Sequence, residues 1–153
     1  MTASRHQLAP AEAFDLRQCA CLNLRQASRA VTQLYDDFLR PTGLRITQFS
    51  LLAVIKITGG ASIGDLADAA VMDRTTLTRN LKLLETMKLI RSAEGDDARV
   101  RLVTLTKAGE ARLAAAQPYW EKAQRHMTER LGRPELGRLL AGLSGAVAAG
   151  QSR

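Results

Sequence analysis

The stretch that decides the fold reads Asp73-Arg74-Thr75-Thr76-Leu77-Thr78-Arg79-Asn80-Leu81-Lys82-Leu83-Leu84-Glu85. Leu77, Leu81 and Leu84 recur at spacings of four and three residues, which places them on one face of a helix. Asp73 stands just before this helix and can cap it, because a carboxylate accepts hydrogen bonds from the free N–H groups of the first turn. The pattern predicts an amphipathic helix that buries its leucines.

The opposite face of this helix and its flanks carry hydroxyl and cationic side chains. They belong to Arg74, Thr75, Thr76, Thr78, Arg79 and Lys82, and no acid interrupts them. In a DNA major groove, threonine contacts base edges or a thymine methyl, arginine bonds guanine twice, and lysine meets phosphate. We therefore predict that these six residues contact DNA, although a solvated polar helix face would have the same composition.

The segments before and after this helix in the sequence form a larger structural unit with it. A short helix and a tight turn precede it, from Ile63 onward. Behind it, Leu89 to Ala93 and Val100 to Leu105 are typical of two paired strands. Helix, turn, helix and hairpin in this order predict a winged helix-turn-helix over residues 47–106, which is a device for reading duplex DNA.

The tip of the hairpin has a charge pattern of its own. The turn Glu94-Gly95-Asp96-Asp97-Ala98 is followed by Arg99. Asp97 and Arg99 are two residues apart, so in extended chain they point the same way. A carboxylate can then hold the guanidinium in one pose for entry into a minor groove. A solvated charged turn is the alternative, but the adjoining basic helix favours a DNA contact by both residues.

Taken together, these motifs resemble the MarR-type transcriptional regulators over nearly the whole length. The resemblance rests on Asp65-Leu66-Ala67, on Thr76 to Glu85, on Leu89-Ile90-Arg91, and on Asp97-Ala98-Arg99 running on to Gly109. It implies a homodimer with one winged helix per subunit and the Asp–Arg pair at each wing. One position departs from the family pattern: Lys88 stands where a glycine usually precedes the first wing strand. Lys88 must either adopt a left-handed helix cap or end the helix differently.

Bulk properties agree with a nucleic-acid partner. The chain of 153 residues is one domain's worth, 46% of it is hydrophobic, and its net charge of +7 favours a polyanion. No apolar run approaches the roughly 18 residues of a membrane span. Residues 1–13 lack a secretory pattern. We expect a single cytoplasmic domain over 1–153 with no membrane partner.

Long amphipathic helices are expected on both flanks. The apolar spacing predicts helices over 14–39, 107–131 and 134–149. It also predicts a helix that Thr47 caps, with Ile57 facing inward, and that ends at Gly59. Packing 14–39 and 107–150 against a second copy would bury their stripes and set two recognition helices one DNA turn apart, on a pseudo-palindromic operator. A monomeric bundle is the alternative. The fold class is thus mainly α: a winged helix-turn-helix with a small β-hairpin wing and long N- and C-terminal dimerisation helices.

Cys19 and Cys21 allow two interpretations. Two small apolar side chains in a reducing compartment is the plain one. The resemblance implies a second, since Cys21 aligns with the reactive cysteine of organic-hydroperoxide sensors and Tyr35 with one of the two tyrosines that engage it. Arg25 stands at the other tyrosine's position, and a nearby guanidinium can make a thiol more nucleophilic. Cys21, Arg25 and Tyr35 are therefore candidates for a redox or ligand switch.

Catalytic and metal sites are not expected. The serines lack a nearby His–acid arrangement, no glycine-rich phosphate loop is present, and Cys and His have no zinc spacing. We predict no cofactor and no enzyme activity. The favoured function is a dimeric, sequence-specific transcriptional repressor, released from DNA by a small-molecule inducer or by thiol oxidation. The alternatives are a thiol-based peroxide-reactive enzyme using Cys21 and a nonspecific architectural DNA binder.

Overall fold

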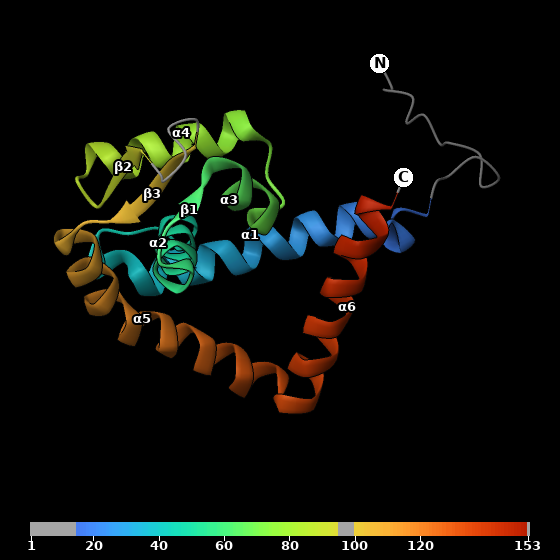
Figure 1. Cartoon of the computed structure of the whole chain (residues 1–153). Helices are drawn as coiled ribbons and strands as arrows, with labels where there is room; N and C mark the ends of the chain where they lie inside the picture. The colour runs from blue at the N-terminus through green and yellow to red at the C-terminus, as the bar shows by residue number, and fades with distance from the viewer. Residues whose placement is uncertain (1–14, 95–99, 153) are drawn as a thin grey trace, which may run out of the picture. The chain divides into compact units, whose positions relative to one another are not determined.

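The computed structural model describes residues 15–94 and 100–152 of the chain. The α-helices are α1 (Ala20–Leu39), α2 (Ile46–Thr58), α3 (Ile63–Ala70), α4 (Arg74–Thr86), α5 (Lys107–Leu131) and α6 (Arg133–Gln151) (Figure 1). The strands are β1 (Ala61–Ser62), β2 (Ile90–Glu94) and β3 (Arg101–Leu105), and short 3-10 helices span Leu16–Gln18 and Arg40–Thr42. The chain divides into two compact units, Met1–Gln33 and Leu34–Arg153. The predicted mainly α fold class with a winged helix-turn-helix is confirmed; the single-domain boundary stays a prediction.

The sheet lies in the second unit and has three antiparallel strands in the order β1-β3-β2. Ile90 pairs with Leu105 and Glu94 with Arg101, so the predicted hairpin is confirmed. The pairing of Ala61 with Val103 adds β1, which the sequence analysis missed. A strand of two residues is too short to show an alternating pattern.

The leucine face of α4 forms part of the core of the second unit. Leu77 and Leu84 are fully buried and Leu81 is 6% exposed, as the spacing predicted. They pack in one cluster with Leu52 of α2 and Leu66 of α3. Burying a leucine side chain contributes about 1.5–3 kcal/mol, so this face fixes which side of α4 remains in solvent.

The start of α2 differs from the prediction. Thr47 is not the cap: Arg45 is the N-cap residue, and the Gln48 side chain accepts a hydrogen bond from its backbone N–H at 2.9 Å. The free N–H of Ile46 donates instead to the carboxylate of Asp36, on α1, at 2.7 Å. The helix ends at Gly59 with φ +69°, as expected. Ile57, expected inside, is 84% exposed.

The two C-terminal helices follow the predicted bounds closely, whereas the N-terminal one begins later than predicted. Thr106 caps α5 by accepting from the Gly109 N–H at 3.0 Å, and α5 covers the predicted 107–131. Pro134 lies in the first turn of α6, as predicted. At the other flank, α1 begins at Ala20 rather than at residue 14, and the residues just before it form a 3-10 turn that Asp15 caps. Within the described residues, no helix is long and apolar enough to cross a membrane.

Candidate nucleic-acid interface

The first half of the candidate interface is the pair α3 and α4. Ser62 caps α3, accepting from the Asp65 N–H at 3.1 Å while its own hydroxyl donates to the Asp65 carboxylate at 2.7 Å. The turn after α3 passes through Val71 at φ +49°. Asp73 then caps α4, as predicted. This reciprocal capping supplies partners for backbone groups that would otherwise be unpaired at both helix starts.

Asp73 also engages a predicted contact residue. Its carboxylate accepts from the Thr76 N–H at 2.9 Å and from the Thr76 hydroxyl at 2.6 Å. These hydrogen bonds, with the Thr76 side chain first, lower the pKa of Asp73 from its ordinary value. The cap is therefore ionised at neutral pH, which suits the positive end of the helix dipole.

The hydroxyl hydrogens of two threonines are already used inside α4. Thr76 donates to Asp73, and Thr78 donates to the Arg74 carbonyl at 2.6 Å. Toward an outside partner, these side chains offer a lone pair and a methyl group rather than a donor. They suit a base amino group or a thymine methyl.

All six predicted contact residues of α4 are exposed, so the structure presents Arg74, Thr75, Thr76, Thr78, Arg79 and Lys82 to solvent. Arg74 differs from the others in direction. A Cβ built on Gly64 would lie 3.5 Å from its Nη2, so the guanidinium reaches the first turn of α3. Arg74 thus extends the basic surface from α4 onto the preceding helix.

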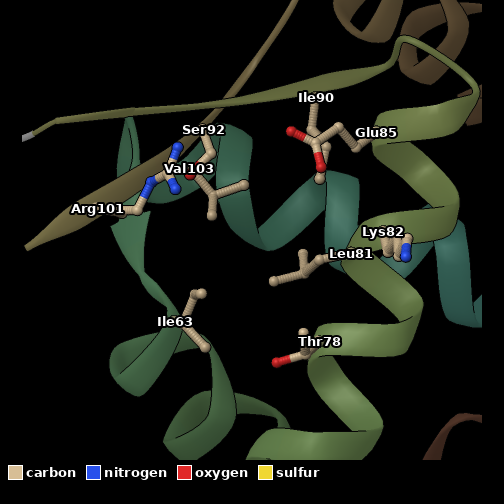
Figure 2. A pocket seen from close by; sticks show the side chains of 9 residues that line it. All are labelled: Ile63, Thr78, Leu81, Lys82, Glu85, Ile90, Ser92, Arg101 and Val103. Carbon is tan, nitrogen blue, oxygen red and sulfur yellow. The ribbon is translucent and has the colours of Figure 1, made fainter.

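A pocket of about 260 Å³ lies between α4, the start of α3 and the hairpin (Figure 2). Its apolar lining comes from Ile63, Leu81, Ile90 and Val103, and its polar lining from Thr78, Lys82, Glu85, Ser92 and Arg101. Figure 2 shows Arg101 on the strand side and Lys82 on α4. The structure therefore places cations on both walls of this pocket, which is the groove between α4, the recognition helix, and the hairpin, the wing.

Sequence reasoning missed Arg101. The signal was available: Arg99-Val100-Arg101 alternates, and in a strand residues two apart share a face. Asp97 and Arg99, the predicted wing contacts, lie outside the described residues. The described strands end at the Glu94–Arg101 pair, and Arg91 donates from Nε to the Thr104 hydroxyl across the sheet at 3.3 Å.

Lys88 resolves the alternative left open by the sequence. Its φ is +60°, so the lysine adopts the left-handed conformation without glycine. The Lys88 N–H donates to the Glu85 carbonyl at 2.8 Å and the Leu89 N–H to the Leu84 carbonyl at 3.0 Å. This pair of bonds is the Schellman ending of a helix, in which glycine normally occupies the position of Lys88.

The candidate switch residues lie on or beside α1. Cys19 and Cys21 are free thiols; Cys21 and Arg25 are exposed, and the Cys19 sulfur accepts from the Leu22 N–H at 3.5 Å. Tyr35 is buried and its hydroxyl donates to Gln124 at 2.6 Å. Burial raises the pKa of Tyr35 above its usual value. Cys21 lies in the first turn of α1 and belongs to the first unit, whereas Tyr35 lies in the C-terminal part of α1 and belongs to the second.

Known proteins are similar to this chain in sequence and in architecture. Residues 42–100 match the family model described as "MarR family". The M. tuberculosis transcriptional regulator MosR, solved in complex with DNA, is 41% identical, with a TM-score of 0.77. The match covers 88% of this chain and 99% of MosR.

Two curated relatives match a shorter stretch. The HTH-type regulator YwoH of Bacillus subtilis is 29% identical over 87 residues, which are 57% of this chain and 64% of YwoH. SarZ of Staphylococcus epidermidis, also an HTH-type transcriptional regulator, is 31% identical over 91 residues, 59% of this chain and 62% of SarZ. The matched part thus spans a little under two thirds of these curated relatives.

Proposed function

Because this chain belongs to the MarR family, we propose that it is a dimeric transcriptional regulator that binds duplex DNA sequence-specifically. The observation that carries the proposal is the exposed Thr, Arg and Lys surface of α4 beside a groove with cations on both walls. The DNA complex of MosR, a relative at 41% identity, supports it. A net charge of +7 adds attraction to phosphate.

In this proposal the residues of α4 divide the work of recognition. Arg79 bonds a base edge, since its planar guanidinium matches the two acceptors of guanine, and Lys82 neutralises a phosphate. Thr76 and Thr78 read through their methyl groups and lone pairs, because their hydrogens are held within the helix. Thr75 completes the base-reading set. Arg74 contacts the DNA phosphate backbone beside α3. At the wing, Arg99 enters the minor groove and Asp97 holds its guanidinium in position.

Dimerisation would complete the reading unit. Along α6, large apolar side chains are exposed in the single chain: Leu139, Leu140, Leu143 and Val147. Exposed apolar surface of this kind on one helix is typical of an interface. A two-fold pairing through the terminal helices 14–39 and 107–150 would cover it and present two recognition helices to a pseudo-palindromic operator.

We further propose that the regulator is a repressor released by a signal at α1. For a redox signal, the Cys21 thiolate attacks an organic hydroperoxide, giving a sulfenate on the protein and an alcohol. Its exposure supports such a reaction. For a small-molecule inducer, Arg25 and Tyr35 would supply polar contacts, and binding would favour one spacing of the two reading heads.

A selection of bound sequences from random duplex DNA tests the proposal. We expect enrichment of two inverted half-sites whose centres are about 10 base pairs apart, or a multiple of that. Unrelated DNA should compete poorly for the selected sequence at fixed salt. Equal competition by unrelated DNA would instead indicate a nonspecific architectural binder and would refute the proposal.

A further inference from the structure

The turn that follows α4, just before β2 begins, meets the first turn of α5 at one place, which we call the joint: Lys88, Leu89, Thr106 and Gly109. All four residues belong to the unit that begins at Leu34. The proposed DNA reading does not use these residues, but they connect the recognition helix to the helix that leaves the winged domain. The inference drawn from them rests on the proposed function.

Thr106 holds three parts of the joint at once. Its hydroxyl donates to the Lys88 carbonyl at 2.7 Å and accepts from the Gly109 N–H at 3.0 Å. Its own backbone N–H donates to the Leu89 carbonyl at 3.0 Å. One residue therefore ties the turn between α4 and β2 to the N-terminus of α5.

Gly109 lets α5 come unusually near to the chain entering β2. It is buried, and a Cβ built on it would overlap the Leu89 carbonyl oxygen and lie 2.9 Å from the carbonyl carbon. The neighbour is backbone of a residue that is itself only 2% exposed, so it cannot rotate away. A larger residue at 109 must shift the first turn of α5 relative to α4.

Such a shift would be amplified along the helix. With 25 residues, α5 is roughly 37 Å long at 1.5 Å per residue. By the same geometry, a rotation of about 10° at one end moves the other by about 6 Å. That displacement approaches two base-pair steps, which are about 3.4 Å each.

We propose that Thr106 and Gly109 are positioning residues: they fix the angle between α4 and α5 and thereby set which half-site spacing the dimer reads. The Schellman ending at Lys88 makes the joint stiff on the α4 side, and the three hydrogen bonds of Thr106 make it stiff on the α5 side. Neither residue contacts DNA in this scheme.

The test uses the full-length protein and duplexes that carry the selected half-sites at spacings varied by single base pairs. Gly109→Ala and Thr106→Val are compared with Thr106→Ser, which keeps the hydroxyl, and with Lys107→Ala, an exposed control in the same turn. We expect both controls to keep the wild-type optimum. Gly109→Ala and Thr106→Val should prefer another spacing and bind the original one roughly 100-fold more weakly, because simultaneous engagement of both half-sites is lost.

A duplex with one half-site separates positioning from general damage. Both test variants should bind it with nearly wild-type affinity. An unchanged spacing optimum, or an equal loss on single and paired half-sites, overturns the inference. If Gly109→Ala shows no cooperative thermal transition, it is not folded, and the spacing preference of Thr106→Val alone tests the inference. Thr106→Val preserves the shape of the side chain. If the wild type selects no paired half-sites at all, the proposed function fails and this inference with it; an unchanged optimum in folded variants removes the inference alone.

Discussion

At the scale of single residues, the hydrogen bonds within α4 change what its side chains can do outside it. Thr76 and Thr78 have given their hydroxyl hydrogens to Asp73 and to the Arg74 carbonyl. Arg79 and Lys82 are exposed cations, and their side chains carry donors and no acceptors. Thr76 and Thr78 can therefore supply shape and acceptors to a partner, while Arg79 and Lys82 supply donors.

Arg79 and Lys82 should differ in how their loss affects binding. We expect Arg79→Ala to relax preference at particular base pairs, because a base contact is removed. Lys82→Ala should weaken all sequences alike and reduce the slope of log affinity against log salt by about one unit. Binding to a panel of single-base operator variants at several salt concentrations measures both. An unaltered specificity profile for Arg79→Ala would transfer base reading to Thr75, Thr76 and Thr78.

Lys88 is a residue at which stability can be gained. A left-handed conformation is unfavourable for a side chain with a Cβ, by about 1–2 kcal/mol, whereas glycine adopts it freely but is more disordered when unfolded. Lys88→Gly should therefore raise the free energy of unfolding by about 0.5–1 kcal/mol, measured by urea denaturation. Lys88→Ala is the matched control, because it removes the charge and keeps the Cβ. Equal stability of both variants would mean that backbone strain is not the cause.

At the scale of elements, the wing and the recognition helix enclose one groove. Arg101 on β3 and Lys82 on α4 both line it. The wing therefore continues the α4 surface. Substitutions that remove its charged side chains should lower DNA affinity and leave the stability of the fold unchanged.

Alanine substitutions at the wing tip test this expectation. Arg99→Ala should weaken operator binding by about 1–3 kcal/mol, and Asp97→Ala by less, since it removes only the orientation of the arginine. Titration of labelled operator at fixed salt gives both values. Wild-type affinity in both variants would show that the wing contacts lie elsewhere, and Arg101→Ala would then be the next variant to measure.

Elements with local signals were predictable from the sequence, and those fixed by distant contacts were not. The leucine spacing and Asp73 gave α4, and Thr106 gave the start of α5. The start of α2 depends on Asp36, ten positions before Ile46 on another helix, so a rule that looks for an adjacent cap selects Thr47 wrongly. Ile57 was misplaced because α2 is apolar on most faces and its period is ambiguous. Arg101 had a local signal in the alternation of Arg99-Val100-Arg101, but the wall of the pocket that it lines follows only from its register in the folded sheet.

At the scale of the whole molecule, the exposed apolar face of α6 predicts an interface with a second copy of the chain. Leu140 and Leu143 are 53% and 37% exposed and, with Val147, share one face at helical spacing. Leu140→Glu would place a charge at the proposed interface, which costs several kcal/mol unless it is paired. We expect a dissociation constant for the dimer at least about 100-fold higher, seen by sedimentation, with operator binding lost in parallel.

A control on the opposite face of the same helix makes this test specific. Ala149 is exposed and points away from the Leu140–Val147 stripe by helical geometry. Ala149→Glu should leave both self-association and operator binding unchanged. A Leu140→Glu protein that still sediments as the wild type would contradict dimerisation through α6.

A chemical change at α1 would reach the DNA through the pairing of the two copies in the proposed dimer. A sulfenate on Cys21 adds a polar group to a proposed dimerisation helix and would shift the pairing of the two copies. We expect an organic hydroperoxide to release wild-type protein and Cys19→Ser from operator DNA, and to leave Cys21→Ser bound. Titration of the three protein–DNA complexes with the hydroperoxide measures the release. Addition of a thiol reductant then tests whether DNA binding is restored. Release that persists in Cys21→Ser, or is absent from the wild type, would leave a small-molecule inducer as the better account. In that case Arg25→Ala and Tyr35→Phe become the informative variants, because Arg25 and Tyr35 are the candidate polar contacts and Tyr35→Phe removes the bond to Gln124 while keeping the ring.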